Sequence, residues 1–464
     1  MAAFLTLSQI VLILAAGYLL THKALPWVAI RLGRALGFPM KLSPIWGKRI
    51  ARFKSIRRGY YAFLIVTTLF VLSFFLELMV NNRARVIVYN GQVAFPALKE
   101  WLNNRIPFVK FRVFNKASAF GQIGEGEVNY RRFQLWSRDP GYLRAEIASR
   151  RAASAREEAG LLALPFPGPG RSPADRAAWD RLRAKIDADK ASTTALERSY
   201  TVFESGRTFC LMPLYPYSAT EHLLDDIAEQ PPNRPSWAHP LGTEDSGLDV
   251  LPQLLYGFRI SLSFALIITT LGYMIGVVVG AVMGYYGGWT DILIQRFIEI
   301  WASIPFLYVI MIIADIIKPT FIILVVLLVV LSAWMGITYT IRGEFYREKA
   351  RDYVQAAIAM GASDWKVMIR HILPNSLVPI VTFAPFAVEG YIAFLVGLDF
   401  LGFGLPVGTP SWGHLLDQGN QHLIQYPHLI VAPVVASIAT LFLIVMVGEA
   451  VREAFDPKVF SRLR

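Results

Sequence analysis

The chain has 464 residues, of which 54% are hydrophobic and 17% are charged, and its mean hydropathy is +0.43. These values exclude an ordinary soluble domain and predict a membrane protein with several spans. The net charge of +12 does not by itself indicate a nucleic-acid partner, because membrane proteins concentrate basic residues in cytoplasmic loops; we expect no nucleic acid to bind. The single cysteine, Cys210, excludes an internal disulfide and a cysteine-based metal site.

Seven segments are long and apolar enough to cross about 30 Å of hydrocarbon, which needs roughly 20 helical residues. They cover residues 4–22, 60–80, 260–284, 292–317, 320–341, 377–397 and 429–449. No charged residue precedes the first segment, which argues against a signal peptide; a start codon placed too far upstream is the alternative explanation. The sequence predicts an all-α polytopic membrane protein, with an extra N-terminal helix (1–22), a first core helix (60–80) and five more core helices within 256–464.

The charges between the spans give the expected orientation. Residues 23–59 contain ten Lys or Arg and no Asp or Glu, so the positive-inside rule places this segment in the cytoplasm and the N-terminus in the periplasm. Counting spans from there puts 81–255 outside, 342–376 inside and 398–428 outside. The C-terminus is then cytoplasmic, and its tail has more basic than acidic residues, as an inside segment should.

The long segment 81–255 is large enough for a domain of its own. Its first part alternates apolar and polar residues in "RVIVYNGQVAF" and "FVKFRVF", which predicts short strands. The stretches "LRAEIASRRAASAREEAGLLAL" and "ADRAAWDRLRAKIDADKAS" predict two helices, separated by the Pro- and Gly-rich "PFPGPGRSP". We expect a mixed α+β extracytoplasmic domain, whose basic helices either have a solvated face or contact lipid headgroups or an acidic partner.

The stretch "VQAAIAMGASDWKVMIRHILPN", residues 354–375, interrupts two apolar runs and is too polar to span a bilayer. Gly361 is suited to a left-handed helix end. Ser363 can cap a second helix, with Asp364 in its first turn facing the positive end of the helix dipole. The pattern predicts a helix, a tight turn and a second helix.

The second of these helices has an apolar stripe. Trp365, Met368, Ile369 and Ile372 recur at helical spacing, and Pro374 ends the helix before the next span. A cytoplasmic helix with such a face either lies on the membrane or docks into a groove on a partner.

This helix–turn–helix resembles the EAA loop of bacterial ABC-importer permeases, in which a pair of alanines, a glycine and a Leu-Pro pair recur at fixed spacing. The matching residues are Gln355, Ala356, Ala357, Gly361, Leu373 and Pro374. The first of them departs from the motif, where glutamate is usual.

Three further blocks resemble the dipeptide/oligopeptide (OppC/DppC) branch of that family, nearest to the YejE-type subunit. They are "HPLGTEDSGLDVLPQLLYGFRISLSFAL", "LDFLGFGLPVGTPSWGHLL" and "GEAVREAFDP". Glu244 and Leu248 in the first block depart from the usual Asp and Arg. The resemblance covers roughly 50–100 and 236–460, and leaves out the first span and the Ala/Arg-rich insert 140–200.

The resemblance implies a type I transmembrane permease subunit of an ATP-binding-cassette importer, which moves peptides or peptide-like compounds from periplasm to cytoplasm across the bacterial inner membrane. It implies as partners a second, YejB/DppB-like permease subunit, ATPase subunits and a periplasmic substrate-binding protein, besides lipid and the peptide. The segment 342–376 would be the coupling helix that docks on the ATPase. Its coupling residues would be Gln355, Ala356, Ala357, Gly361, Ser363, Leu373 and Pro374.

Other features of the sequence fit a subunit without its own chemistry. No G-x-x-x-x-G-K-[ST] phosphate loop occurs, so the chain is not expected to hydrolyse ATP alone, and ATP and Mg would bind only to the partner ATPase. No Ser/His/Asp or Cys/His arrangement has a defensible spacing, and the histidines are scattered. We expect no catalytic residue, no bound cofactor and no metal site.

Acidic residues within membrane spans are costly and often line an aqueous route. Three candidates for the translocation pathway are Glu299, Asp315 and Glu389. Glu299 could instead pair with Arg296, and Asp315 with Lys318, each three residues away. Glu389 has no charged neighbour in the sequence and is the strongest candidate. Pro305 is expected to kink its span.

Two other classes of function remain open from the residues alone. A stand-alone secondary transporter would show inverted repeats and a helix broken at mid-membrane, which the sequence does not indicate. An envelope scaffold would account for the extra first span and the unmatched insert.

Overall fold

The computed structural model describes residues 7–28, 31, 44–106, 110–163, 173–224, 229–317 and 319–456. Their contacts divide the chain into two compact units. The helix unit comprises residues 6–74 and 219–464, and the insert unit comprises residues 75–218. Residues 219–249, which the sequence assigned to the outer domain, thus have their contacts with the helix unit.

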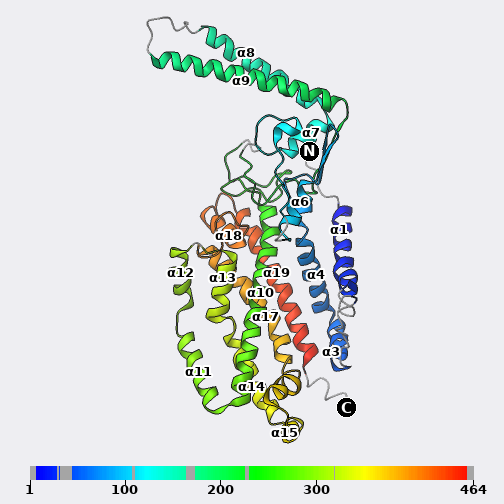
Figure 1. The fold of residues 1–464 in the computed structure, drawn as a ribbon, viewed down its shortest axis with the longest axis vertical. Helices are drawn as coiled ribbons and strands as arrows, with labels where there is room; N and C mark the ends of the chain where they lie inside the picture. The colour runs from blue at the N-terminus through cyan, green and yellow to red at the C-terminus, as the bar shows by residue number, and fades with distance from the viewer. Residues whose placement is uncertain are drawn as a thin grey trace. The chain divides into compact units, whose positions relative to one another are not determined.

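The helix unit is built almost entirely of helices (Figure 1). Before the insert lie α1 (Leu7–Leu19), the π-helical turn η1 (Leu20–Ala24), α3 (Pro44–Ser55) and α4 (Arg57–Ser73). After it come α10 (Val250–Tyr286), α11 (Gly288–Ala302), α12 (Phe306–Ile316), α13 (Phe321–Leu328), the π-helical turn η3 (Val329–Ala333) and α14 (Met335–Lys349). The chain ends with α15 (Asp352–Ala359), α16 (Asp364–Lys366), the π-helical turn η4 (Val367–Ile372), α17 (Val378–Phe400), α18 (Trp412–Gln421) and α19 (His428–Phe455).

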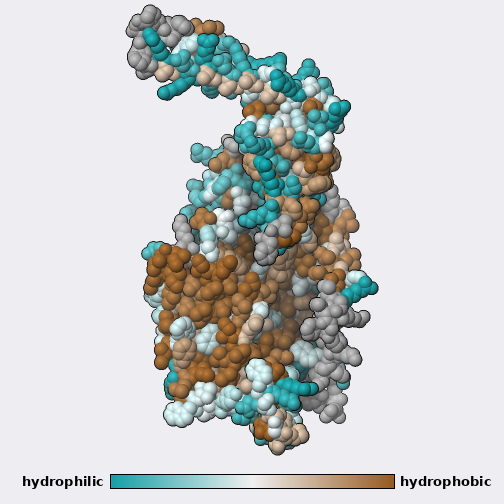
Figure 2. Space-filling model, in the orientation of Figure 1, coloured by the Kyte–Doolittle hydropathy of each residue, from teal (hydrophilic) through white to brown (hydrophobic). Residues whose placement is uncertain are grey.

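By length and composition, four of the described helices can each cross a membrane, and up to seven spans result if each of three bent pairs counts as one. The bends are 95° between α3 and α4, 60° between α11 and α12, and 42° between α13 and α14. The second bend lies at Pro305, where the sequence predicts a kink. Figure 2 shows a broad apolar belt over the helix unit, with polar side chains at the end that carries α15.

A stripe of glycines brings α10 and α14 together. Gly272, Gly276, Gly280 and Gly284 recur every fourth residue on one face of α10. A Cβ on Gly276 would lie 2.3 Å from Ile337 Cγ2, so only glycine permits this approach. Small residues at helix contacts are typical of membrane bundles, where close packing replaces the hydrophobic drive. The stripe fixes the position of α14, which leads into α15.

The insert unit combines a small sheet with helices. Its strands β1 (Val86–Tyr89), β2 (Gln92–Ala94) and β3 (Thr208–Leu211) form an antiparallel sheet of order β2-β1-β3. Its helices are α5 (Leu76–Met79), α6 (Pro96–Asn103), the 3₁₀ turn η2 (Ala117–Phe120), α7 (Tyr130–Arg138), α8 (Gly141–Ala163) and α9 (Pro173–Glu204). Ile87, Phe133 and Phe203 are fully buried in its core.

Several predictions for the insert agree with its structure. "RVIVYNGQVAF" forms the β1–β2 hairpin, and the two Ala/Arg-rich stretches form α8 and α9, which lie against each other as a helical hairpin (Figure 1). The predicted strand in "FVKFRVF" is wrong for its described residues 110–114, which form no strand. The Asn103 side chain instead binds Phe111, accepting from its N–H at 2.7 Å and donating to its carbonyl oxygen at 2.8 Å. A side chain of α6 thus takes the place of a neighbouring strand.

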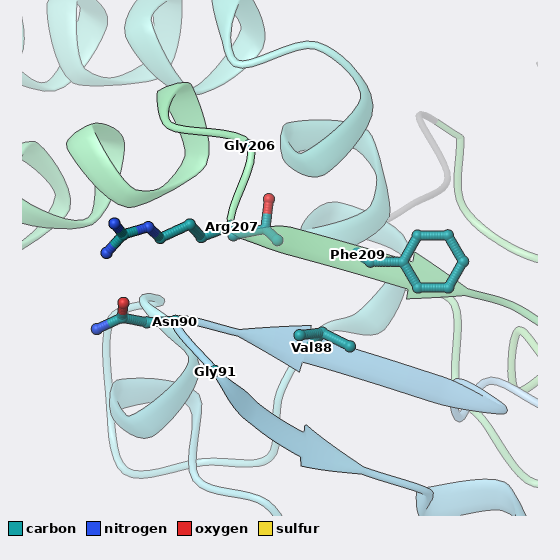
Figure 3. Close-up of a pocket in the computed structure, with 7 residues that line it drawn as sticks. Val88, Asn90, Gly91, Gly206, Arg207 and Phe209 are labelled. Carbon is teal, nitrogen blue, oxygen red and sulfur yellow. The ribbon is translucent and has the colours of Figure 1, made fainter.

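The face of the sheet that points away from the core carries a shallow hollow of about 470 Å³. Val88 and Phe209 line its apolar part, and Asn90 and Arg207 stand at the turn end of the strands (Figure 3). Phe209 is 53% exposed, so this face of the sheet remains open.

Candidate functional site

The predicted helix–turn–helix is present as α15, a turn at 360–363, and α16 with η4; we call these segments the coupling element. Gly361 has φ +80°, the left-handed conformation expected from the sequence. Its N–H donates to the carbonyl of Ile358 at 2.9 Å, and the N–H of Ala362 donates to the carbonyl of Ala357 at 3.1 Å. These bonds satisfy the C-terminal carbonyls of α15, which would otherwise lack partners.

One side of the coupling element packs into the bundle. Val354, Val367 and Ile372 are buried in an apolar cluster that includes Phe345 of α14, and Ala357 is also buried, at 3% exposure. Ala357 is therefore an internal packing residue, while Ala356 beside it is exposed. Of the two alanines, only Ala356 is accessible to a partner.

The predicted apolar stripe is divided between two faces. Met368 and Ile372 are buried, whereas Trp365 is 70% and Ile369 43% exposed. The reason is the π-helical turn η4, whose wider turns break the spacing that would align the four residues. With Met360, which is 81% exposed, Trp365 and Ile369 form an open apolar tip on the coupling element.

Polar contacts hold the coupling element to the end of α10. The Tyr285 hydroxyl donates to Asp364 Oδ1 at 2.7 Å, and Lys349 Nζ donates to the Tyr285 carbonyl at 2.5 Å. Gln355 donates from Nε2 to the Lys349 carbonyl at 2.8 Å, so it closes the C-terminus of α14. Ser363 occupies the N-cap position but makes no capping bond through its side chain.

A tyrosine closes the other side of the element. The Tyr353 hydroxyl donates to Glu348 Oε2 at 2.7 Å and accepts from Asn375 Nδ2 at 2.8 Å. This joins the start of α15 to the segment that follows η4. Leu373 packs partly buried against the same cluster as η4, and Pro374 is exposed beyond the last turn.

A charged clamp lies between α11 and α14, and the sequence analysis missed it. Arg342 donates from Nε to Asp291 Oδ1 at 2.5 Å and from Nη2 to Oδ2 at 2.6 Å. The Tyr346 hydroxyl donates to Asp291 Oδ2 at 2.7 Å. The Asp291 side chain is 8% exposed. The sequence could have indicated this pair, because Asp291 and Arg342 stand at the ends of two predicted spans and opposite charges near the membrane usually form ion pairs.

The three acidic candidates for a pathway have different surroundings. Glu299 accepts hydrogen bonds from Arg296 Nη1 at 2.6 Å and from Gln295 Nε2 at 3.0 Å. The pairing with Arg296 that the sequence offered as the alternative is therefore present. Asp315 is exposed, and its expected partner Lys318 lies outside the described residues. Glu389 is half-buried on α17 and forms no hydrogen bond or ion pair with another residue that the structure describes.

In the described part of the chain, no group of three His, Cys, Asp or Glu side chains is placed to hold a metal ion. The two features that stand out are the anchored coupling element and the apolar bundle it packs against. α15 lies at the opposite end of the helix unit from α18 (Figure 1). An apolar helical bundle with such an element at one end fits the membrane permease that the sequence resemblance implies.

Comparison with known proteins agrees with this class. Residues 276–461 match the family model described as the inner-membrane component of binding-protein-dependent transport systems. The chain is 33% identical over 419 residues to the peptidoglycan transport system permease protein YejE of Agrobacterium fabrum, covering 90% of this chain and 94% of the relative. It is 34% identical over 417 residues to the inner-membrane ABC transporter permease protein YejE of Escherichia coli, covering 90% and 98%.

A more distant relative is the oligopeptide transport system permease protein OppC of Haemophilus influenzae, which is 34% identical over 47% of this chain and 70% of its own length. The chain belongs to the OppC/DppC family of ABC-importer permeases, and within it to the YejE type. It is a permease subunit of an ABC importer. The predicted family and class are confirmed.

Proposed function

We propose that this chain imports peptides or peptide-like compounds from the periplasm into the cytoplasm, together with a second permease subunit, ATPase subunits and a periplasmic binding protein. The observation that carries the proposal is the coupling element, an anchored helix–turn–helix with an exposed apolar tip, in a chain of the YejE type. The names of the relatives support the cargo, because peptidoglycan and oligopeptides both contain peptide bonds.

The proposed orientation follows from charge. The basic segment 23–59 and the coupling element would face the cytoplasm, the N-terminus and the insert unit the periplasm, and the C-terminus the cytoplasm. A cysteine introduced at Ser55, in a variant with Cys210 replaced by Ser, tests this. We expect no labelling by a membrane-impermeant maleimide in intact cells, and labelling after permeabilisation. Labelling in intact cells would contradict the orientation.

The cargo is tested by uptake into cells that lack their other peptide importers. We expect radiolabelled tri- and tetrapeptides or muropeptides to enter only when the chain and its partners are present. Uptake should stop when the phosphate-loop lysine of the partner ATPase is replaced. Import that continues with the disabled ATPase would contradict an ABC mechanism.

The exposed tip is the proposed contact with the ATPase. Trp365 would insert into a groove on the partner, as exposed aromatic anchors do at interfaces. We expect Trp365→Ala to lower ATPase co-purification and peptide uptake. The matched control is Trp289→Ala on α11, because Trp289 is also widely exposed, at 77%. Equal losses in both variants, or no loss in either, would contradict the assignment.

Glu389 is the proposed pathway residue that meets the peptide, with Glu299 and Asp315 in secondary roles. A half-buried carboxylate without a partner among the described residues is available to a cationic group of the cargo. We expect Glu389→Gln to reduce uptake while the complex still assembles. Glu197→Gln in the insert unit is the control, because Glu197 has no proposed role in the pathway and already has Arg151 as a partner. Normal uptake by Glu389→Gln would remove this residue from the pathway.

A further inference from the structure

Helix α3 runs across the direction of its neighbouring span. It is bent by 95° from α4, an apolar helix of 17 residues and so about 25 Å long. Since α4 forms most of the predicted span 60–80, a helix perpendicular to it would lie in the plane of the membrane. Four of the 12 residues of α3 are Lys or Arg, too many for the hydrocarbon core itself, so the place that fits α3 is the headgroup layer.

The apolar side of α3 is held by the rest of the helix unit. The Trp46 ring lies 5.3 Å from the ring of Phe455 at the end of α19. The Phe53 ring lies 6.1 Å from that of Tyr60 and 5.7 Å from that of Phe63, both on α4. These contacts turn the opposite side of the helix outward.

The outward side is basic. Lys48 and Lys54 on α3, and Arg57 and Arg58 at the start of α4, are all exposed. None of the four forms an ion pair with another residue that the structure describes. Arg52, by contrast, reaches Glu453 Oε1 at 3.6 Å. The surface formed by the first four residues, which we call the basic collar, therefore carries four uncompensated positive charges.

The segment that follows α1 carries a second aromatic and basic group near the same end of α4. Helix α1 runs antiparallel to α4. The neighbouring pairs are Gly17 with Leu72 and His22 with Thr67. Five residues further along, Trp27 comes level with about Ala62 in the second turn of α4, and the Arg31 guanidinium lies 4.1 Å from its ring centroid. Tryptophan and basic residues at one depth are typical of the boundary between hydrocarbon and headgroups.

We propose that the basic collar binds the phosphate groups of anionic phospholipids in the leaflet at the N-terminal end of α4. The in-plane axis of α3 and the tryptophan in the neighbouring segment, near the same end of α4, favour lipid over an acidic protein surface. Each basic residue near an anionic surface contributes about 1 kcal/mol, which is roughly a fivefold effect on binding. The collar thus anchors this part of the helix unit and fixes its depth.

The proposal is tested with the purified full-length chain in detergent, mixed with phosphatidylglycerol and phosphatidylcholine and examined by native mass spectrometry. We expect the wild-type chain to retain phosphatidylglycerol preferentially. The variant with Lys48, Lys54, Arg57 and Arg58 replaced by Gln should retain it at least about tenfold less, with phosphatidylcholine unchanged. Raising the salt concentration should reduce the preference of the wild type.

The matched control removes four exposed arginines from α8 and α9 of the insert unit. These are Arg144, Arg156, Arg181 and Arg198, each replaced by Gln. The control should keep the preference; equal loss in the control would show unspecific attraction and overturn the proposal. A collar variant that retains phosphatidylglycerol like the wild type would also overturn the proposal. If that variant also co-purifies with less ATPase, the collar contacts a protein partner instead. If the fourfold variant unfolds in phosphatidylcholine, the double variant with Lys48→Gln and Lys54→Gln replaces it in the test. We expect this double variant to retain phosphatidylglycerol several-fold less than the wild type. Unchanged retention would contradict the proposal.

Discussion

Gly361 is the position where one backbone conformation decides the geometry of the coupling element. Its φ of +80° costs a residue with a side chain about 1–2 kcal/mol. A Cβ added there would meet no atom within 4 Å, so Gly361→Ala introduces conformational strain without a clash. We therefore expect the turn to open about 5- to 30-fold more often, since 1.4 kcal/mol corresponds to a factor of ten.

Amide hydrogen exchange measures this opening directly. The N–H groups of Gly361 and Ala362 are protected by the bonds that close α15, and their exchange should accelerate by that factor in Gly361→Ala. Gly343→Ala is the control, because Gly343 lies in helix α14 and an added Cβ there also meets nothing within 4 Å. Alanine should be neutral or stabilising at that site. Unchanged exchange around Gly361, or equal acceleration in both variants, would refute the reasoning.

Three further predictions concern other sites. Asp291→Asn should lower the free energy of unfolding by about 2 kcal/mol, because it breaks charge-assisted bonds to Arg342. Glu299→Gln, at an exposed ion pair, should lower it by less than about 1 kcal/mol. Denaturant unfolding measures both changes. Burial raises the pKa of the Glu244 carboxyl above its usual range. The folded state therefore binds this proton more tightly than the unfolded state does, and the free energy of unfolding should fall as the pH rises from the unfolded-state pKa to the folded-state pKa. Glu244→Gln should flatten this fall in stability above the usual pKa of a glutamate, and an unchanged slope would contradict the assignment. Burial raises the pKa of the Cys210 thiol to about 12, so iodoacetamide at pH 8 should alkylate it only after unfolding. Mass spectrometry measures the labelling. Rapid labelling of the folded chain would contradict this prediction.

The sequence alone determined the features that depend on neighbouring residues. Runs of apolar residues located the membrane helices, the break at Pro305 followed from its ring, and the left-handed turn followed from Gly361. The β1–β2 hairpin and the α8–α9 pair also came from local patterns, because hydrophobic period and turn residues act within a few positions of each other. The family could also be inferred from the sequence, because its motifs are contiguous stretches of residues.

Tertiary structure decided which surfaces are free and which charges are paired. The segment 110–114 has the alternation of a strand, yet Asn103 binds its backbone and no strand forms. The apolar stripe of the coupling element was expected to face a partner as a whole, but η4 turns Met368 inward and leaves Trp365 outside. Asp291 and Arg342 lie 51 positions apart; they meet because the glycine face of α10 brings α14 close. Such partners are chosen by packing over long sequence separations, which no local pattern encodes.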